Sequence, residues 1–353
     1  MSIKQLFYLP WWFVRARFFG RKQPLQTVLF ISDRCNLQCK HCSVYQQENQ
    51  HNMTYDEVRR HLEYSYKMGS RFVDFEGGEV TIWRDGDHRI NDLIDLAKSI
   101  GFYSATITTN AQLPFAGCHA DSIWVSLDGI GQYHEAVRGK GTFGRLEKNI
   151  ASCGHKHLSV NMVVNTLNYE SVDETIEYAK QNTAIEMISI NFHTPFPGTE
   201  YLMIDKSLRN EIIDKVIAYK RKGYPIMNSV SGLKKMKDMT FEKRCWVTNF
   251  IYPDGSRGNC IGEGTDICSD CGFCMAGEMA SVFNFCPTAV NPQYTRGRLV
   301  HFFSLRAVHQ DFHLCPIGAE DMQCLFLHAH RSAMYQSVIR SKSHLIGPTN
   351  NFR

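Results

Sequence analysis

From residue 26 to residue 194, short β-favouring runs alternate with longer stretches of helical periodicity. Six runs are predicted as strands, at residues 26–32, 72–78, 103–110, 122–129, 157–165 and 187–194. Strands that alternate with helices pair in parallel through right-handed crossovers. The pattern therefore predicts an α/β fold with a parallel sheet, either doubly wound or curled into a partial barrel.

The intervening stretches carry recognisable helix signals. In the first of them, Thr54 is followed three residues later by Glu57, which is a capping box, and the periodic stretch ends at Gly69. Stretches 87–101, 168–183 and 207–225 show helical periodicity with a polar face. These segments are predicted to be the helices that connect the strands.

Polar and glycine residues gather where the predicted strands end. In parallel sheets the ligand lies beyond the carboxyl ends of the strands, so these groups are predicted to surround one site. They are the cysteines after the first run, Gly77, Gly78 and Glu79 after the second, Asn110 after the third, Ser126 and Asp128 on the fourth, and Asn165 after the fifth.

The composition excludes several classes of protein. The 353 residues carry a net charge of only +4, with 21% charged and 43% hydrophobic residues, which favours neither a nucleic-acid binder nor a disordered chain. No uncharged apolar run reaches the roughly 18 to 20 residues of a membrane span, and no signal peptide opens the chain. A cytoplasmic protein is predicted, in which thirteen cysteines are metal or cluster ligands more readily than disulfides.

Three of these cysteines fall within eight residues, at Cys35, Cys39 and Cys42. Closely spaced thiolates bind zinc or iron, but a closed zinc site needs four ligands and a four-iron cluster usually takes four cysteines. No fourth ligand lies at the usual distance, although His41 inside the motif is a candidate. Three ligands leave one metal position open for a substrate or cofactor.

The spacing Cys35-x3-Cys39-x2-Cys42 resembles the signature of the radical S-adenosylmethionine (SAM) superfamily. In that family three cysteines hold a [4Fe-4S] cluster, and SAM chelates the fourth iron. The stretch Gly77-Gly78-Glu79 is similar to the family's element that receives the methionine ammonium, where glycines permit close approach and a carboxylate pairs with the cation. His41 stands where the family commonly has an aromatic residue.

The resemblance extends along the chain and implies ribose and carboxylate contacts from five further residues, Asn110, Ser126, Asp128, Arg138 and Asn165. Taken one at a time, an Asn or Asp at a strand end is more often a turn former. The fold implied is a partial (β/α)6 TIM-like barrel with a small cysteine-rich extension. The chemistry implied is one-electron reduction of SAM to a 5′-deoxyadenosyl radical, with an electron donor such as flavodoxin or ferredoxin.

A second cysteine set lies further along the chain. The spacing Cys245-x9-Gly255-x4-Cys260 resembles the opening of the SPASM and twitch modules, which hold auxiliary iron-sulfur clusters, although the later SPASM spacing is absent. The segment from Cys271 also shows a short similarity to radical SAM enzymes of hopanoid synthesis. The resemblance implies one auxiliary cluster, and a zinc knuckle is the alternative. The predicted ligands are Cys245, Cys260, Cys268, Cys271, Cys274 and Cys286.

The predicted division of the chain has four parts. Residues 1–22 are an aromatic and basic segment, 23–238 the radical SAM core, 239–328 the cysteine-rich module and 329–353 a basic tail. Residues 1–22 combine seven aromatic side chains with basic residues, which favours either peripheral contact with the inner membrane face or a helix that closes the bottom of the barrel. The other isolated cysteines, Cys118 and Cys153, are predicted to be buried apolar residues.

Three functions remain open from the sequence. The first is a radical SAM enzyme acting on a lipid or isoprenoid-like small molecule, which the aromatic segment and the hopanoid similarity favour. The second is a SPASM-type maturase of a peptide or protein, which the second cysteine set favours. The third is a non-catalytic iron-sulfur or zinc scaffold, and Gly77, Gly78 and Glu79 argue against it because a scaffold needs no SAM ammonium site.

Overall fold

The computed structural model describes residues 3–42, 50–260, 262 and 265–286, and its centre is one mixed sheet of eight strands in the order β6-β5-β4-β3-β2-β1-β7-β8. The first six strands are parallel to their neighbours, and all six strand predictions are confirmed with shorter ends. They are β1 (Gln26–Phe30), β2 (Phe72–Glu76), β3 (Ser104–Thr109), β4 (Ser122–Ser126), β5 (Leu158–Val164) and β6 (Met187–Phe192).

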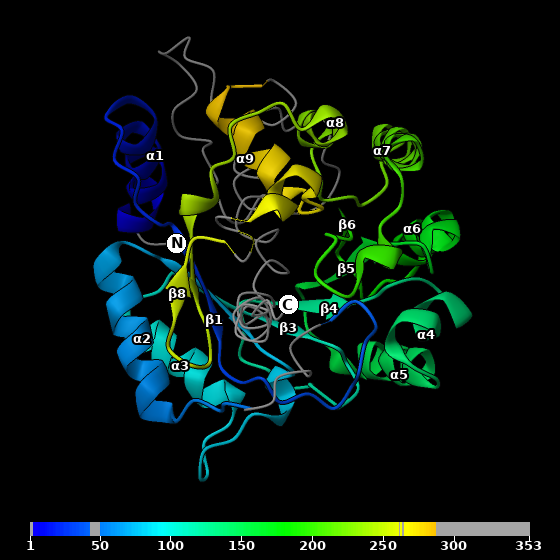
Figure 1. Cartoon of the computed structure of the whole chain (residues 1–353). Helices are drawn as coiled ribbons and strands as arrows, with labels where there is room; N and C mark the ends of the chain where they lie inside the picture. The colour runs from blue at the N-terminus through cyan, green and yellow to red at the C-terminus, as the bar shows by residue number, and fades with distance from the viewer. Residues whose placement is uncertain (1–2, 43–49, 261, 263–264, 287–353) are drawn as a thin grey trace, which may run out of the picture.

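The helices lie outside the curved sheet, as Figure 1 shows. They are α1 (Ile3–Phe18), α2 (Tyr55–Met68), α3 (Ile90–Ile100), α4 (Gln132–Arg138), α5 (Thr142–Cys153), α6 (Val172–Gln181), α7 (Lys206–Arg221), α8 (Val230–Asp238) and α9 (Met275–Phe283). Short 3-10 turns lie at Val80–Ile82, Tyr169–Ser171, Glu200–Leu202, Cys245–Val247 and Asp266–Asp270. β6 and β8 are the two edges of the sheet, so the fold is an open barrel rather than a closed one.

The first connecting helix forms as its sequence predicts. The Thr54 hydroxyl accepts the Glu57 N–H, and the Glu57 carboxylate accepts the Thr54 N–H at 2.8 Å. Gly69 ends α2 with φ of 115°, a conformation that L side chains rarely adopt. These local signals fix where α2 begins and ends between the first two strands.

Two further strands follow the predicted radical SAM core, which was expected to end at residue 238. β7 (Thr248–Ile251) pairs in parallel with β1, and β8 (Arg257–Gly258) folds back against it as a hairpin. α9 was not predicted, because every one of its residues is buried and no exposed polar face marks its period. The division of the chain at residues 238 and 239 stays a prediction, and the sheet continues across it. Residues 287–353, with Cys315, Cys324 and the predicted basic tail, lie outside the described residues.

One face of α1 completes a second hydrophobic core. Leu9, Trp12 and Phe13 are buried, and both aromatic rings contact Phe283 of α9. α9 in turn packs along α8, and Figure 1 shows it between α1 and α8, above the open side of the sheet. No helix among the described residues is long and apolar enough to cross a membrane.

Candidate active site at the carboxyl ends of the strands

A cavity opens where the carboxyl ends of the strands meet. Its empty space, counted with the part that is open to solvent, is about 850 Å³. All three cysteines of the first set line it, with residues from the ends of β2, β3, β4 and β6. The other lining residues are Leu37, His41, Glu76, Gly77, Gly78, Glu79, Thr108, Thr109, Asn110, Ser126, Arg138, Val163, Phe192, His193, Thr194, Phe196 and Phe273.

The two glycines after β2 bring that strand end against the cysteine loop. The Gly78 N–H donates to the Ser32 carbonyl at 2.7 Å, and the Glu79 N–H donates to the Arg34 carbonyl at 2.9 Å. A Cβ atom on Gly78 would lie 2.0 Å from the Arg34 oxygen, and one on Gly77 would lie 2.5 Å from the Ser32 oxygen. The glycines are thus needed for close approach to the protein's own backbone, which adds to the predicted approach to a ligand.

Glu79 is buried and joins the ends of β2 and β3. Its Oε1 accepts from the hydroxyls of Thr81 and Thr109 at 2.6 and 2.7 Å and from the Thr81 N–H, while Oε2 accepts the Asn110 N–H at 2.7 Å. Each carboxylate oxygen has two lone pairs, and Oε2 accepts only one of these bonds. The carboxylate is therefore oriented by the protein and retains acceptor capacity toward the cavity.

Asn110 lies beside the first cysteine. Its side-chain amide donates to Asn36 at 2.7 Å and approaches the Cys35 sulfur at 3.8 Å. Burial, with smaller contributions from Glu79 and the neighbouring cysteines, raises the pKa of the Cys35 thiol to about 12. Three thiols that line one cavity are the kind of donors that hold an iron-sulfur cluster, so this donor set fits such a cluster.

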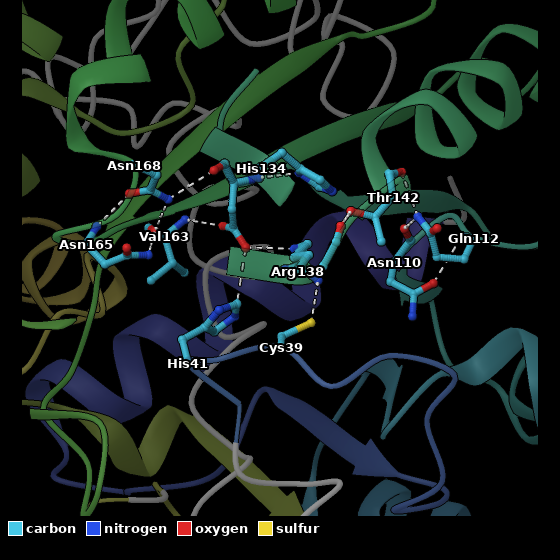
Figure 2. A network of polar contacts seen from close by, with 12 residues as sticks. Cys39, His41, Asn110, Gln112, His134, Arg138, Thr142, Val163, Asn165 and Asn168 are labelled. Atoms are coloured by element: carbon cyan, nitrogen blue, oxygen red, sulfur yellow. Dashed lines mark hydrogen bonds and ion pairs between the residues drawn. The ribbon is translucent and has the colours of Figure 1, made fainter. Parts of the chain in front are cut away.

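Arg138, the last residue of α4, is buried at the cavity wall. Its Nε donates to Asp128 Oδ2 at 2.7 Å, and its Nη1 lies 3.8 Å from the Cys39 sulfur. Figure 2 shows the side chain of Arg138 next to that of Cys39. Burial opposes charge on Arg138, but the Asp128 carboxylate and then Cys39 outweigh it and raise the pKa of the guanidinium. The cation is thus fixed beside the cysteine loop.

Two of the predicted site residues do not line the cavity. Asp128 is fully buried behind Arg138, where its other oxygen accepts the Val163 N–H at 2.9 Å. The Asn165 side chain forms hydrogen bonds within its own turn, because it accepts the Leu167 N–H and donates to the Val163 carbonyl. Figure 2 shows Asn165 beside Val163 and Asn168. Asp128 therefore orients Arg138, and Asn165 forms the turn after β5, which was the alternative interpretation of such residues.

Sequence reasoning missed the residues that follow β6 on the cavity wall. Burial lowers the pKa of His193 to about 4, and its Nε2 lies 3.0 Å from the Thr199 carbonyl oxygen. The rings of Phe192 and Phe196 line the same side. The hydrophobic pattern of the strand does not distinguish these residues from core residues. Their position at the carboxyl end of a parallel strand could have predicted them, because ligands bind there.

The β7–β8 hairpin brings two cysteines of the second set together. Cys245 precedes β7 and Cys260 follows β8, and a hydrogen bond with Cys245, together with burial, raises the pKa of the Cys260 thiol. Both line a second, largely apolar cavity of about 410 Å³, which Cys271 also lines. Burial raises the pKa of Cys271 to about 11. These three thiols, which line one cavity, are also the kind of donors that hold an iron-sulfur cluster.

The segment with Cys271 and Cys274 is bonded to the end of β6. The Phe192 N–H donates to the Gly272 carbonyl, the Gly272 N–H to the Thr194 hydroxyl and the Cys274 N–H to the Asn191 side chain, all at 2.9 Å. A Cβ atom on Gly272 would lie 1.9 Å from the Phe192 oxygen. The next residue, Phe273, lines both cavities and so stands between the two cysteine sets.

The remaining cysteines of the second set lie apart from this cavity. Cys274 is fully buried but does not line it, and Cys268 donates to the Gly262 carbonyl at 3.2 Å. Cys286 packs against the aromatic core of α1. Within the part of the chain that the structure describes, no group of three His, Cys, Asp or Glu is close enough for a single metal ion. Which cysteines bind a cluster stays a prediction.

Comparison with known proteins agrees with this geometry. Residues 29–179 match the family model described as the radical SAM superfamily. The PqqA peptide cyclase of Bradyrhizobium diazoefficiens is 28% identical over 44% of this chain and 43% of the relative. A probable GTP 3′,8-cyclase of Methanothermobacter marburgensis is 23% identical over 69% of this chain and 86% of the relative. For most of the leading curated relatives, the chain spans about half of their length.

Solved structures show the same fold. Streptococcus suis SuiB bound to the precursor peptide SuiA aligns with a TM-score of 0.54 at 20% identity, over 68% of this chain and 60% of SuiB. The open parallel sheet is thus the partial barrel of radical SAM proteins, as the sequence predicted. The cofactors of this superfamily are a [4Fe-4S] cluster and SAM, which the three-thiol cavity with its oriented carboxylate fits. Residues 29–179 are a radical SAM domain, in agreement with the resemblance of the cysteine spacing to that superfamily.

Proposed function

We propose that this protein is a radical SAM enzyme that modifies a peptide, with an auxiliary iron-sulfur cluster in the second cavity. The observation that carries the proposal is the shared wall at Phe273, which places a second set of buried thiols beside the first cavity. The identity to a peptide cyclase supports the peptide as substrate. No comparison supports the lipid or isoprenoid substrate that the sequence favoured.

The cysteines, Glu79 and Arg138 have different roles in the proposed reaction. Cys35, Cys39 and Cys42 would hold the cluster, which with bound SAM supplies a 5′-deoxyadenosyl radical. Glu79 would accept the ammonium of SAM through Oε2, since that oxygen has acceptor capacity left. Arg138 would keep its positive charge beside Cys39, where it stabilises the anionic thiolate.

The apolar residues of the cavity protect a reactive intermediate. Phe192, Phe196 and Phe273 line the first cavity, and side chains of this kind exclude water. A substrate that enters from the open side would lie between these rings and the cysteine loop. Because the cavity is open to solvent on one side, part of a longer peptide can remain outside while one residue is inside.

Mass spectrometry of a deletion strain tests the substrate class. The strain is complemented with the intact gene or with the Cys39→Ala variant, and its peptides and lipids are compared. A peptide whose mass changes only with the intact gene supports the proposal. A change confined to lipids would contradict it, and turnover of GTP by the purified enzyme would instead place the chain with the GTP 3′,8-cyclases.

One observation favours action on a lipid or isoprenoid-like small molecule as a second candidate function. The outer face of α1 exposes Phe7, Trp11 and Phe18, and Arg17 beside them is exposed as well. Exposed aromatic rings next to cations suit the headgroup region of an anionic bilayer. Flotation with anionic liposomes tests it: replacing Phe7 and Trp11 by Ser would abolish binding if this face contacts lipid, whereas the buried Trp12 is left intact to preserve the fold.

A further inference from the structure

Arg209 reaches from the first turn of α7 to the cysteine segment that is bonded to β6. Its Nη2 donates to the Cys271 carbonyl at 3.0 Å and contacts the Met239 sulfur at 3.5 Å. The guanidinium carbon lies 5.1 Å from the centre of the Phe192 ring. A backbone carbonyl, a thioether and an aromatic ring therefore hold the cation at the edge of the second cysteine set.

The Nε atom of Arg209 is buried and has no hydrogen-bond partner among the described residues. Buried donors of native proteins nearly always have a partner, and an unsatisfied charged donor costs more than a neutral one. Through the Cys271 carbonyl, Arg209 contacts the segment that carries the thiols of Cys271 and Cys274. An anionic group held by these thiols would satisfy both the donor and the charge.

We propose that Arg209 positions an auxiliary iron-sulfur cluster of the second cysteine set and favours the reduced state of that cluster. This inference rests on the proposed function only in requiring that the second set binds a cluster. Reduction adds one negative charge to the cluster. A nearby cation attracts that charge more strongly in a protein interior of low dielectric constant than it would in water. Hydrogen bonds and net charge near a cluster are what set its reduction potential.

The test measures the reduction potential of the second cluster alone. In the full-length chain, Cys35, Cys39 and Cys42 are replaced by Ala, so that the signal in an electron paramagnetic resonance titration comes from the second set. Into this background are introduced Arg209→Met, which removes the charge and the donor, and Arg209→Lys, which keeps only the charge. Arg221→Met is the matched control, because Arg221 is an exposed arginine on the same helix.

Arg209→Met is expected to shift the potential to more negative values, Arg209→Lys to shift it less, and Arg221→Met to leave it unchanged. If Arg209→Met prevents cluster assembly, iron per folded protein becomes the measurement, and retention of iron in Arg209→Lys and Arg221→Met supports the role of the charge. An unchanged potential in Arg209→Met at equal iron content overturns the inference.

Absence of iron from the background chain also overturns the inference, because no cluster would then exist for Arg209 to position. Neither result depends on a substrate. The peptide function is tested separately in the chain with its first cysteine set intact, so failure of one proposal does not imply failure of the other.

Discussion

Arg138 and Asp128 form a buried ion pair, with 2.7 Å between Nε and Oδ2, that joins the end of α4 to the segment after β4. Both side chains are buried. Arg138 also lies beside Cys39, so the pair holds a positive charge next to the first cysteine set. Arg138 lines the cavity, whereas Asp128, which was predicted as a ligand contact, does not, and its role in ligand binding stays a prediction.

Loss of the Asp128 charge should destabilise the fold. Asp128→Asn leaves the buried Arg138 cation without an anion, and breaking a buried pair in this way costs about 3–5 kcal/mol of the free energy of unfolding. Urea denaturation followed by circular dichroism measures the change. The control is Asp214→Asn in the exposed pair with Lys237, where a loss below about 1 kcal/mol is expected. Equal losses in both variants would contradict the assigned role.

Cys39→Ala should remove the first cluster. The reconstituted variant is expected to contain about four fewer iron atoms per chain than the wild type, because one four-iron cluster is lost. It should also fail to convert SAM to 5′-deoxyadenosine with dithionite under anaerobic conditions. Cys153→Ala is the control, since Cys153 is buried at the end of α5 and packs in the main core. Iron assays and chromatography of the products decide the outcome, and full turnover by the Cys39 variant would refute the site.

Gly78→Ala should impair catalysis more than stability. The added methyl meets the Arg34 carbonyl and must push the cysteine loop away from the end of β2. A displacement of about 1 Å in an active site can lower a rate on the order of 100-fold, so a loss of this size in SAM cleavage is expected.

Gly144→Ala is the matched control for Gly78. Gly144 lies within α5, and a Cβ atom there meets nothing within 4 Å. Alanine in a helix interior is more stable than glycine by about 0.5–1 kcal/mol, and the rate of SAM cleavage should not change. A similar loss of activity in both variants would show that glycine content, rather than the contact with Arg34, is responsible.

Stability should fall as pH rises from about 5 to 7 because of Glu278. Burial raises the pKa of this α9 carboxyl to about 7, against hydrogen bonds from Ser229, so the folded state binds a proton that the unfolded state releases near pH 4.5. The protonated form is favoured in the fold, so its contribution is full below pH 4.5 and is lost as pH approaches 7.

The expected decrease in the free energy of unfolding is about 3 kcal/mol for a pKa shift of this size. Unfolding free energies of the wild type and of Glu278→Gln, measured across this pH range, check it. The variant should lack the decline, since glutamine does not titrate. Parallel curves for the two proteins would assign the pH dependence to other groups.

Much of the fold could be predicted because its signals are local. The capping box of Thr54 and Glu57 and the left-handed Gly69 depend on residues within one helix, and the six strands depend on runs of a few residues. β7 and α9 were missed for the opposite reason. β7 is a four-residue strand that exists by pairing with β1, more than two hundred residues away, and α9 has no exposed face to mark its period.

The site shows the same division. The spacing of Cys35, Cys39 and Cys42, with Gly78 and Glu79 after the second strand, was enough to predict the superfamily, because a cluster imposes its ligand spacing on the chain itself. Which polar side chains reach the cavity depended on packing. Tertiary structure alone decided that Asp128 binds Arg138 and that Phe273 stands between the two cysteine sets, because such contacts arise only when distant strand ends meet.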